Sequence, residues 1–182
     1  MKLVILDRDG VINHDSADYI KGPEEWRPLP HSLDAIACLN RAGYRVVVAT
    51  NQAGIGRGLF SVQDLHRIHA RMLEELKIHG GDIEAIFFCP HTPEDHCECR
   101  KPKPGLLLDV AARLKAALGE VYAIGDSQRD LDAARAAGAR PLLVRTGNGR
   151  LTEQGFTAAT AVPVFDDLAG AVAHILGKTP AP

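Results

Sequence analysis

Short apolar runs alternate with segments of helical periodicity along almost the whole chain. The runs are typical of buried strands, and they occupy residues 2–6, 44–49, 83–88, 121–124, 142–144 and 162–165. Between them, apolar side chains recur every three or four positions, which predicts helices over residues 32–42, 62–79, 106–118, 130–137 and 168–176. This alternation predicts an α/β fold of three layers, in which a mostly parallel, Rossmann-like sheet carries helices on both faces.

Small polar residues and glycines mark the ends of the predicted helices. Ser32 is expected to cap the first helix, and Ser61 with Asp64 forms the pattern of a capping box before the second. Gly119 and Gly138 are expected to end the third and fourth helices, because glycine tolerates the left-handed conformation found at helix ends.

The composition is that of one globular domain. The chain has 182 residues, of which 46% are apolar, so we expect a single domain over residues 1–182 with one core. Its 21 basic and 23 acidic residues give a formal net charge of −2, which argues against nucleic acid or a membrane surface as partner. No apolar stretch approaches the ~20 residues of a transmembrane helix and no signal peptide is visible, so we expect a cytoplasmic protein. We also expect a monomer.

Two carboxylates follow the first predicted strand. Asp7 and Asp9 are one residue apart, and side chains that alternate along a strand would point both into the same space. Two negative charges so close together repel each other unless a cation binds between them or one carboxyl stays protonated. Mg²⁺ prefers carboxylate oxygens as ligands. The pair therefore indicates metal and acid/base chemistry, against the alternative of a solvated, Asp-rich turn.

Other polar residues occupy equivalent positions along the chain. Thr50 ends the second predicted strand, Asp126 ends the fourth, and Lys101 precedes the helix before that strand. Strand ends of a parallel sheet share one edge, so these groups are expected to meet near Asp7. A nucleophilic carboxylate, a hydroxyl, an ammonium and a metal-binding carboxylate are the parts that phosphoryl transfer requires.

A compact group of cysteines and a histidine follows the third predicted strand. Cys89, His91, Cys97 and Cys99 match the ligand set of a tetrahedral Zn²⁺ site in the loop 89–99. Such a zinc would be structural, because four protein ligands leave no position for water. The alternative is a set of reduced thiols beside a solvated histidine, and His96 is the nearest rival ligand. The histidines in or beside helices are expected at the surface or at an interface: His31, His66, His69, His79 and His174.

These motifs resemble those of the haloacid dehalogenase superfamily of phosphatases over nearly the whole chain. Residues 7–11 match the first motif, Thr50 the second, Lys101 with Pro102 the third and residues 125–130 the fourth. More narrowly, residues 9–13, 50–55 and 99–102 are similar to the branch that acts on D-glycero-D-manno-heptose 1,7-bisphosphate, and a related branch acts on histidinol phosphate. The resemblance implies a haloacid dehalogenase fold without a separate cap domain, so that short loops shape the pocket.

The resemblance also implies an activity. It implies a Mg²⁺-dependent phosphatase that removes the 7-phosphate of the heptose bisphosphate on the route to ADP-heptose and the lipopolysaccharide core, with histidinol phosphate as the alternative substrate. Asp7 would form an aspartyl-phosphate, and Asp9 would be the general acid and base. Thr50 and Lys101 would stabilise the transferring phosphoryl group.

Metal and substrate residues follow from the same resemblance. Mg²⁺ would be held by Asp7, Asp126 and the backbone carbonyl of Asp9, while Asp130 would orient Lys101 or a metal-bound water. Further candidates for contact with the second phosphate are Arg57 and Lys103. The implied substrate residues are Asn13, Asp15, Asp18, Tyr19, Asn51, Gln52, Ala53 and Arg100.

Two other classes of protein share parts of this pattern. A receiver-type signalling domain also uses strand-end carboxylates, a threonine and a lysine, but its phosphorylated aspartate follows the third strand rather than the first. A zinc-containing binding module without catalysis would explain the loop 89–99. The near-neutral charge and the 5% aromatic content, however, give such a module no basis for binding nucleic acid.

Overall fold

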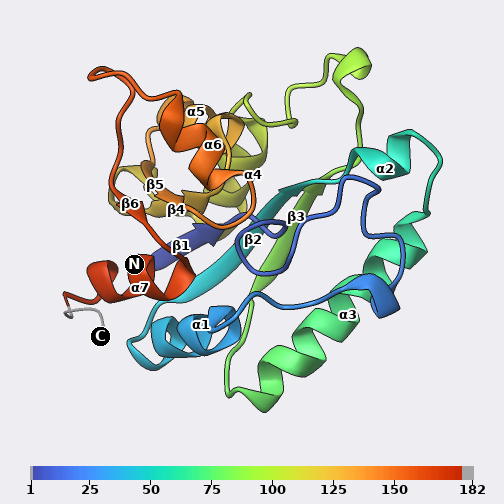
Figure 1. Cartoon of the computed structure of the whole chain (residues 1–182), viewed down its shortest axis with the longest axis horizontal. Coiled ribbons are helices and arrows are strands. Elements are labelled where there is room, and N and C mark those ends of the chain that lie inside the picture. The colour runs from blue at the N-terminus through green and yellow to red at the C-terminus, as the bar shows by residue number, and fades with distance from the viewer. Residues whose placement is uncertain (1, 178–182) are drawn as a thin grey trace.

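A six-stranded parallel sheet forms the centre of the protein, as the computed structural model shows (Figure 1). The structure describes residues 2–177. The strands lie in the order β3-β2-β1-β4-β5-β6, and every neighbouring pair is parallel. Their bounds are β1 Leu3–Leu6, β2 Arg45–Asn51, β3 Ala85–Cys89, β4 Tyr122–Gly125, β5 Arg140–Val144 and β6 Val164–Phe165. The predicted α/β fold is confirmed. The predicted single domain, residues 1–182, extends by residue 1 and residues 178–182 beyond the described range.

Helices cover both faces of the sheet. Their bounds are α1 Ser32–Arg41, α2 Ala53–Gly56, α3 Val62–Ile78, α4 Gly105–Leu114, α5 Gln128–Ala137, α6 Gly149–Gln154 and α7 Leu168–Ile175. In Figure 1, α1, α3 and α7 lie below the sheet, whereas α4, α5 and α6 lie above it. Within residues 2–177, no helix has both the length and the apolar character that crossing a membrane requires.

Alternation along the central strands divides the core in two. Val4 and Leu6 of β1 pack into the cluster that includes α1, α3 and α7, while Leu3 and Ile5 pack into the cluster with α4 and α5. All four side chains are at most 2% exposed. Because a strand buried on both faces needs apolar residues at every position, β1 is a continuous apolar run that ends where the first acid begins.

Several helix ends differ from the prediction. Helix α4 ends at Leu114, because Lys115 adopts a left-handed conformation with φ of 52°, and the apolar Leu118 lies in a separate 3-10 turn, Leu118–Glu120. Ser32 is the first residue of α1 rather than its cap, since its hydroxyl donates to the carbonyl of Ile12 at 2.6 Å. The capping box of Ser61 and Asp64 is confirmed, as is the left-handed Gly138 at the end of α5.

Two long loops leave the carboxyl side of the sheet. Residues 7–31 contain a 3-10 turn at Pro23–Glu25, and residues 90–104 contain another at Pro93–Asp95. The short helices α2 and α6, which the sequence pattern did not predict, also lie in connections after strands. Within the described chain these inserts are small, so loops rather than a second folded unit surround the end of the sheet.

The capping box at the start of α3 yields a prediction about stability. Ser61→Ala should lower the free energy of unfolding by about 1 kcal/mol, because the hydroxyl that accepts the Asp64 amide is lost. Urea denaturation should show a lower midpoint with an unchanged slope. Gln63→Ala, at an exposed position in the same turn, is the control. Equal shifts for both substitutions would show that the cap does not stabilise the helix.

Candidate active site

The carboxyl ends of β1, β2 and β4 bring the predicted polar residues to one edge of the sheet. Asp7 directly follows β1, Thr50 is the penultimate residue of β2, and Asp126 directly follows β4. The Asp7 amide donates to the carbonyl of Ile124 at 2.9 Å, which continues the pairing of β1 with β4 up to the acid. The strand order reverses at this position, and open α/β sheets bind their ligands at such points.

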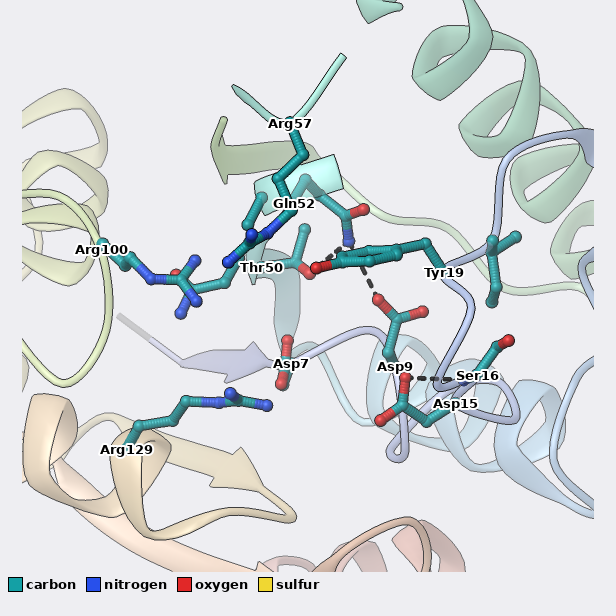
Figure 2. Close-up of a pocket in the computed structure, with 13 residues that line it drawn as sticks. Asp7, Asp9, Asp15, Ser16, Tyr19, Thr50, Gln52, Arg57, Arg100 and Arg129 are labelled. Atoms are coloured by element: carbon teal, nitrogen blue, oxygen red, sulfur yellow. Dashed lines mark hydrogen bonds between the residues drawn. The ribbon is translucent and has the colours of Figure 1, made fainter. Parts of the chain in front are cut away.

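A pocket opens above this edge of the sheet (Figure 2). Its floor carries Asp7, Asp9 and Thr50, and its walls come from the loops after β1 and β2 and from the region after β3. The residues that line it are Asp7, Asp9, Asp15, Ser16, Tyr19, Ile20, Thr50, Asn51, Gln52, Ala53, Arg57, Arg100 and Arg129.

Lys101 is the buried cation beside Asp7. Its Nζ lies 3.0 Å from Asp7 Oδ1 and 2.6 Å from Asp130 Oδ1, and it donates to the carbonyl of Ala49 at 2.9 Å. Burial favours the neutral amine, but Asp130 and Asp7 outweigh it and raise the pKa of Lys101 above its ordinary value. The side chain is therefore a charged ammonium held in a fixed position.

Asp130 is positioned by both of its oxygens. Oδ1 contacts Lys101, and Oδ2 accepts from the backbone amide of Ser127 at 3.0 Å in the capping box of α5. Burial alone would raise the pKa of Asp130, yet the charge of Lys101 lowers it overall. Of the two roles that the resemblance left open, this geometry favours orientation of Lys101.

Asp126 lies in a narrow space enclosed by backbone. Its Oδ2 accepts from the amide of Asn148 at 2.7 Å and from the Asn148 side chain at 3.2 Å. A Cβ on Gly10 or Gly147 would come within 2.2 or 2.1 Å of this oxygen, and both glycines have positive φ, 79° and 54°. Only glycine allows the two backbones to approach the carboxylate so closely.

Three buried carboxylates share this space with one ammonium. Ligand oxygens of Asp7, Asp126 and Asp130 lie within 4.8 Å of one another. Burial, followed by the charge of Asp130, raises the pKa of Asp126 to about 6. Burial together with the neighbouring carboxylates raises the pKa of Asp7 to about 8 against the opposing effect of Lys101. A hard divalent cation with oxygen ligands would balance this charge, so the donor set fits Mg²⁺.

Asp9 has surroundings of the opposite kind. Arg8 donates to Asp9 Oδ1 from Nε at 3.0 Å and from Nη2 at 2.9 Å, and Nη2 also lies 2.9 Å from Oδ2. The amides of Asn13 and Gln52 donate to the same carboxylate at 2.9 and 3.0 Å. Burial raises the pKa of Asp9, but the charge of Arg8 and these hydrogen bonds outweigh it and lower the pKa overall. Two acids one residue apart therefore have their pKa values shifted in opposite directions, a pattern typical of acid/base sites.

Three arginines bring positive charge to the pocket. Arg57 follows α2, Arg100 precedes Lys101, and Arg129 lies in the first turn of α5. Figure 2 shows the side chains of Arg100 and Arg129 extending toward Asp7 from one side, while the ring of Tyr19 lies on the other side above Asp9. Planar guanidinium groups match the geometry of phosphate oxygens, so this pocket suits an anionic substrate.

The structure brings most of the predicted substrate residues into the pocket. Asn13 and Asp18 are the exceptions: Asn13 is fully buried against Asp9, and Asp18 lies in a neighbouring shallow groove. Arg57 lines the pocket, whereas Lys103 pairs with Glu98 outside it. The predicted substrate residues in the lining are Asp15, Tyr19, Asn51, Gln52, Ala53 and Arg100.

Sequence reasoning missed several residues of the site. Arg129 lies inside the fourth motif, so its place at the start of a helix that follows an acidic strand end was a usable signal. Ser16 and Ile20 come from an irregular loop, which carries no periodic signal. His69 was expected at the surface, and that prediction is wrong, since the residue is 6% exposed and its Nε2 lies 3.2 Å from Arg8.

The cysteine and histidine cluster forms a compact group of donors after β3. The Sγ atoms of Cys89, Cys97 and Cys99 lie 3.2 to 3.6 Å from one another, and His91 Nδ1 lies 3.5 Å from Cys89 and 3.3 Å from Cys99. Zn–S bonds near 2.3 Å in a tetrahedron place sulfurs about 3.8 Å apart, so the donor group is close to the required size. His96 is not among these clustered donors. The cluster is compatible with a four-coordinate metal.

Hydrogen bonds connect this cluster with the active-site cations. Arg100 Nη1 donates to the carbonyl of His91 at 3.2 Å. The Asn51 side chain donates to the carbonyl of Lys101 at 3.0 Å and accepts from its amide at 3.1 Å. The loop that carries both cations is therefore attached to the cluster on one side and to β2 on the other.

Comparisons with known proteins agree with this geometry. A family model described as HAD-hydrolase-like matches residues 98–171. A relative from Bordetella bronchiseptica, named D-glycero-beta-D-manno-heptose-1,7-bisphosphate 7-phosphatase, is 51% identical over 176 residues, which cover 97% of this chain and 98% of the relative. A relative of the same name from Neisseria meningitidis serogroup A is 48% identical over 184 residues, which cover 100% of this chain and 98% of the relative.

Solved structures show the same similarity. The crystal structure of D,D-heptose 1,7-bisphosphate phosphatase from B. bronchiseptica, complexed with magnesium and phosphate, has a TM-score of 0.93 and 50% identity, covering 97% of this chain and 99% of that one. The corresponding phosphatase from Burkholderia thailandensis has a TM-score of 0.77 and 42% identity, covering 98% of this chain and 100% of that one. The chain therefore belongs to the heptose-1,7-bisphosphate 7-phosphatase family of haloacid dehalogenase-like hydrolases.

Proposed function

We propose that this protein is a Mg²⁺-dependent phosphatase that removes the 7-phosphate of D-glycero-β-D-manno-heptose 1,7-bisphosphate. The observation that carries the proposal is a pair of neighbouring acids at the floor of an arginine-lined pocket, the buried Asp7 beside Lys101 and the partly buried Asp9 beside Arg8. Relatives named for this substrate match the whole chain, so histidinol phosphate is not favoured. The product would keep its 1-phosphate, as a precursor of ADP-heptose must.

Asp7 is the nucleophile in this proposal. A carboxylate oxygen of Asp7 attacks phosphorus, the bond from phosphorus to the sugar oxygen breaks, and the sugar oxygen takes the electron pair together with a proton from Asp9. Oδ1 of Asp7 is engaged by Lys101 and by the Arg8 amide, at 3.0 and 2.7 Å. Lys101 and Thr50 then neutralise the phosphoryl oxygens as charge builds on them.

Asp9 completes the second half of the reaction. A water molecule attacks the aspartyl-phosphate, Asp9 takes its proton, and the bond from phosphorus to the Asp7 oxygen breaks to release phosphate. The lowered pKa of Asp9 keeps it ionised in the free enzyme. A negatively charged phosphoryl group beside Asp9 raises its pKa again, which supplies the protonated form that leaving-group departure needs.

Asp7, Asp126 and the backbone carbonyl of Asp9 would hold the magnesium ion. The ion supplies charge neutralisation for the phosphoryl group and keeps both carboxylates ionised. Arg100, Arg57 and the loop of Asp15 and Tyr19 would bind the sugar and its second phosphate.

The proposed function extends to the oligomeric state of the protein and to its location in the cell. Under this proposal the protein acts as a monomer. A highly charged sugar phosphate does not cross membranes unaided, so the cytoplasm, where it would be made, is the proposed location.

The zinc ion in this proposal is structural. Cys89, His91, Cys97 and Cys99 would fill all four positions, which leaves none for water. Arg100 and Lys101 directly follow Cys99. The metal would therefore fix the start of the segment that positions these two positively charged side chains next to the substrate.

Among the predictions about function, the first concerns the two acids. Asp7→Asn should abolish turnover and the phosphoenzyme, because an amide neither attacks phosphorus nor binds Mg²⁺ well. Asp9→Asn should retain phosphoryl binding but lose at least about 10²-fold in rate, the scale of a positioned proton donor. Acid-quenched protein analysed by mass spectrometry should carry phosphate on Asp7, and phosphate found on Asp9 would contradict the assignment.

The second prediction concerns recognition of the substrate by Arg100. Arg100→Ala should reduce kcat/KM for the heptose bisphosphate by at least about tenfold, because a charge-assisted hydrogen bond contributes roughly 1.5–3 kcal/mol. A small phosphate ester with no second phosphate should lose less than threefold, which is about 0.6 kcal/mol. Lys103→Ala, whose ammonium lies outside the pocket, is the matched control. Equal losses on both substrates would assign Arg100 to the transferring phosphoryl group or to the fold.

The third prediction concerns the zinc loop. Cys97→Ser or removal of zinc by a chelator should lower the melting temperature and the activity together, and added Mg²⁺ should not restore either. Protein purified without chelator should contain about one zinc per chain by elemental analysis. Cys38→Ser, which alters a thiol outside the cluster, should leave the zinc content unchanged. Full turnover by folded, zinc-free protein would rule out this role for the loop.

A further inference from the structure

Arg8 is a charged side chain buried completely behind the active site. It lies between the two acids in sequence but is 0% exposed and does not line the pocket. A buried guanidinium is costly unless its donors are satisfied. Nε and Nη2 of Arg8 form the forked contact with Asp9, and Nη1 faces His69 Nε2 at 3.2 Å.

His69 reaches this position from a distant part of the chain. It lies in the middle of α3, 61 residues after Arg8, and it is 6% exposed. A guanidinium has donors and no acceptor, so Nε2 of His69 must accept and the ring must be neutral with its proton on Nδ1. Burial, together with the charge of Arg8, lowers the pKa of His69 to about 3, in agreement with a neutral ring.

The contacts of Arg8 define the orientation of its plane. Two atoms of the fork bind Asp9 on one side, and His69 binds the remaining terminal nitrogen. A planar group held at both ends cannot rotate without losing contact with one of its partners. Asp9 is the partner that reaches the pocket, where its carboxylate would meet the departing sugar oxygen.

We propose that His69 is a positioning residue for leaving-group protonation: through Arg8 it holds the Asp9 carboxylate where the proton must be delivered. The inference rests on the proposed role of Asp9 as general acid. It adds a residue on α3, outside the lining of the pocket, to the set that determines the rate. Small displacements of a reacting group lower rates strongly, so loss of the His69 contact should appear in catalysis.

The leaving group distinguishes this role from a merely structural one. An alkoxide leaving from a sugar needs a proton from Asp9, whereas p-nitrophenolate is stable enough to leave without one. The ratio kcat/KM includes steps up to departure of the leaving group, so it isolates this half of the reaction. A loss of fold would lower kcat/KM for both substrates alike.

The experiment compares two substitutions of His69 on these two substrates. His69→Leu removes the acceptor and should lower kcat/KM about tenfold for the heptose bisphosphate but less than about threefold for p-nitrophenyl phosphate. His69→Gln places a carbonyl oxygen near the former Nε2 position and should recover most of the loss. His66→Leu, at an exposed position of the same helix, and Met72→Ala, in the core beneath it, control for surface and stability effects.

Each outcome either supports or overturns the positioning role of His69. Selective loss with rescue by His69→Gln supports it, and equal losses on both substrates, or none, overturn it. Asp9→Asn, measured in parallel, separates the two proposals. If Asp9→Asn shows the selective loss and His69→Leu does not, only the inference fails. If Asp9→Asn itself shows no selectivity, its role as general acid fails, and the inference fails with it.

Discussion

Negative charge is concentrated where the ends of β1 and β4 meet the start of α5, and the other contacts of the site compensate this charge. One carboxylate oxygen from each of Asp7, Asp126 and Asp130 lies within 4.8 Å of the other two, and the three residues are at most 9% exposed. Repulsion and lost solvation would make this arrangement unstable without positive charge at fixed positions. Lys101 provides part of that charge, and the magnesium ion of the proposed mechanism provides the rest.

The surrounding fold places these charges with little freedom. Lys101 is held by Asn51 through its backbone and by Asp130 through its ammonium, and Asp126 is confined by Gly10 and Gly147. Arg8 neutralises Asp9 separately, so the two neighbouring acids do not compete for one cation. Such preorganisation means that little reorganisation is needed when charge develops on a phosphoryl group.

Patterns of hydrophobic and polar residues predicted the strands, most helices and the meeting of Asp7, Thr50, Lys101 and Asp126. These features depend on local periodicity and on the rule that parallel strands share one functional edge. Contacts between residues that are far apart in the sequence could not be predicted. His69 reads as a surface residue in the helical pattern, because nothing local shows that Arg8 needs a partner there. The conformation of the loop of residues 14–20 could not be predicted either. Its backbone is irregular, and this conformation places Asp15 but not Asp18 in the lining of the pocket.

The proposed reaction of this charge-balanced site is the removal of one particular phosphate from a sugar bisphosphate. Phosphorus NMR can follow this reaction in a mixture of the purified protein, D-glycero-β-D-manno-heptose 1,7-bisphosphate and Mg²⁺. The 7-phosphate resonance should be replaced by that of inorganic phosphate, while the resonance of the anomeric 1-phosphate remains. Loss of the anomeric phosphate, or hydrolysis of histidinol phosphate with no turnover of the heptose bisphosphate, would contradict the proposed reaction.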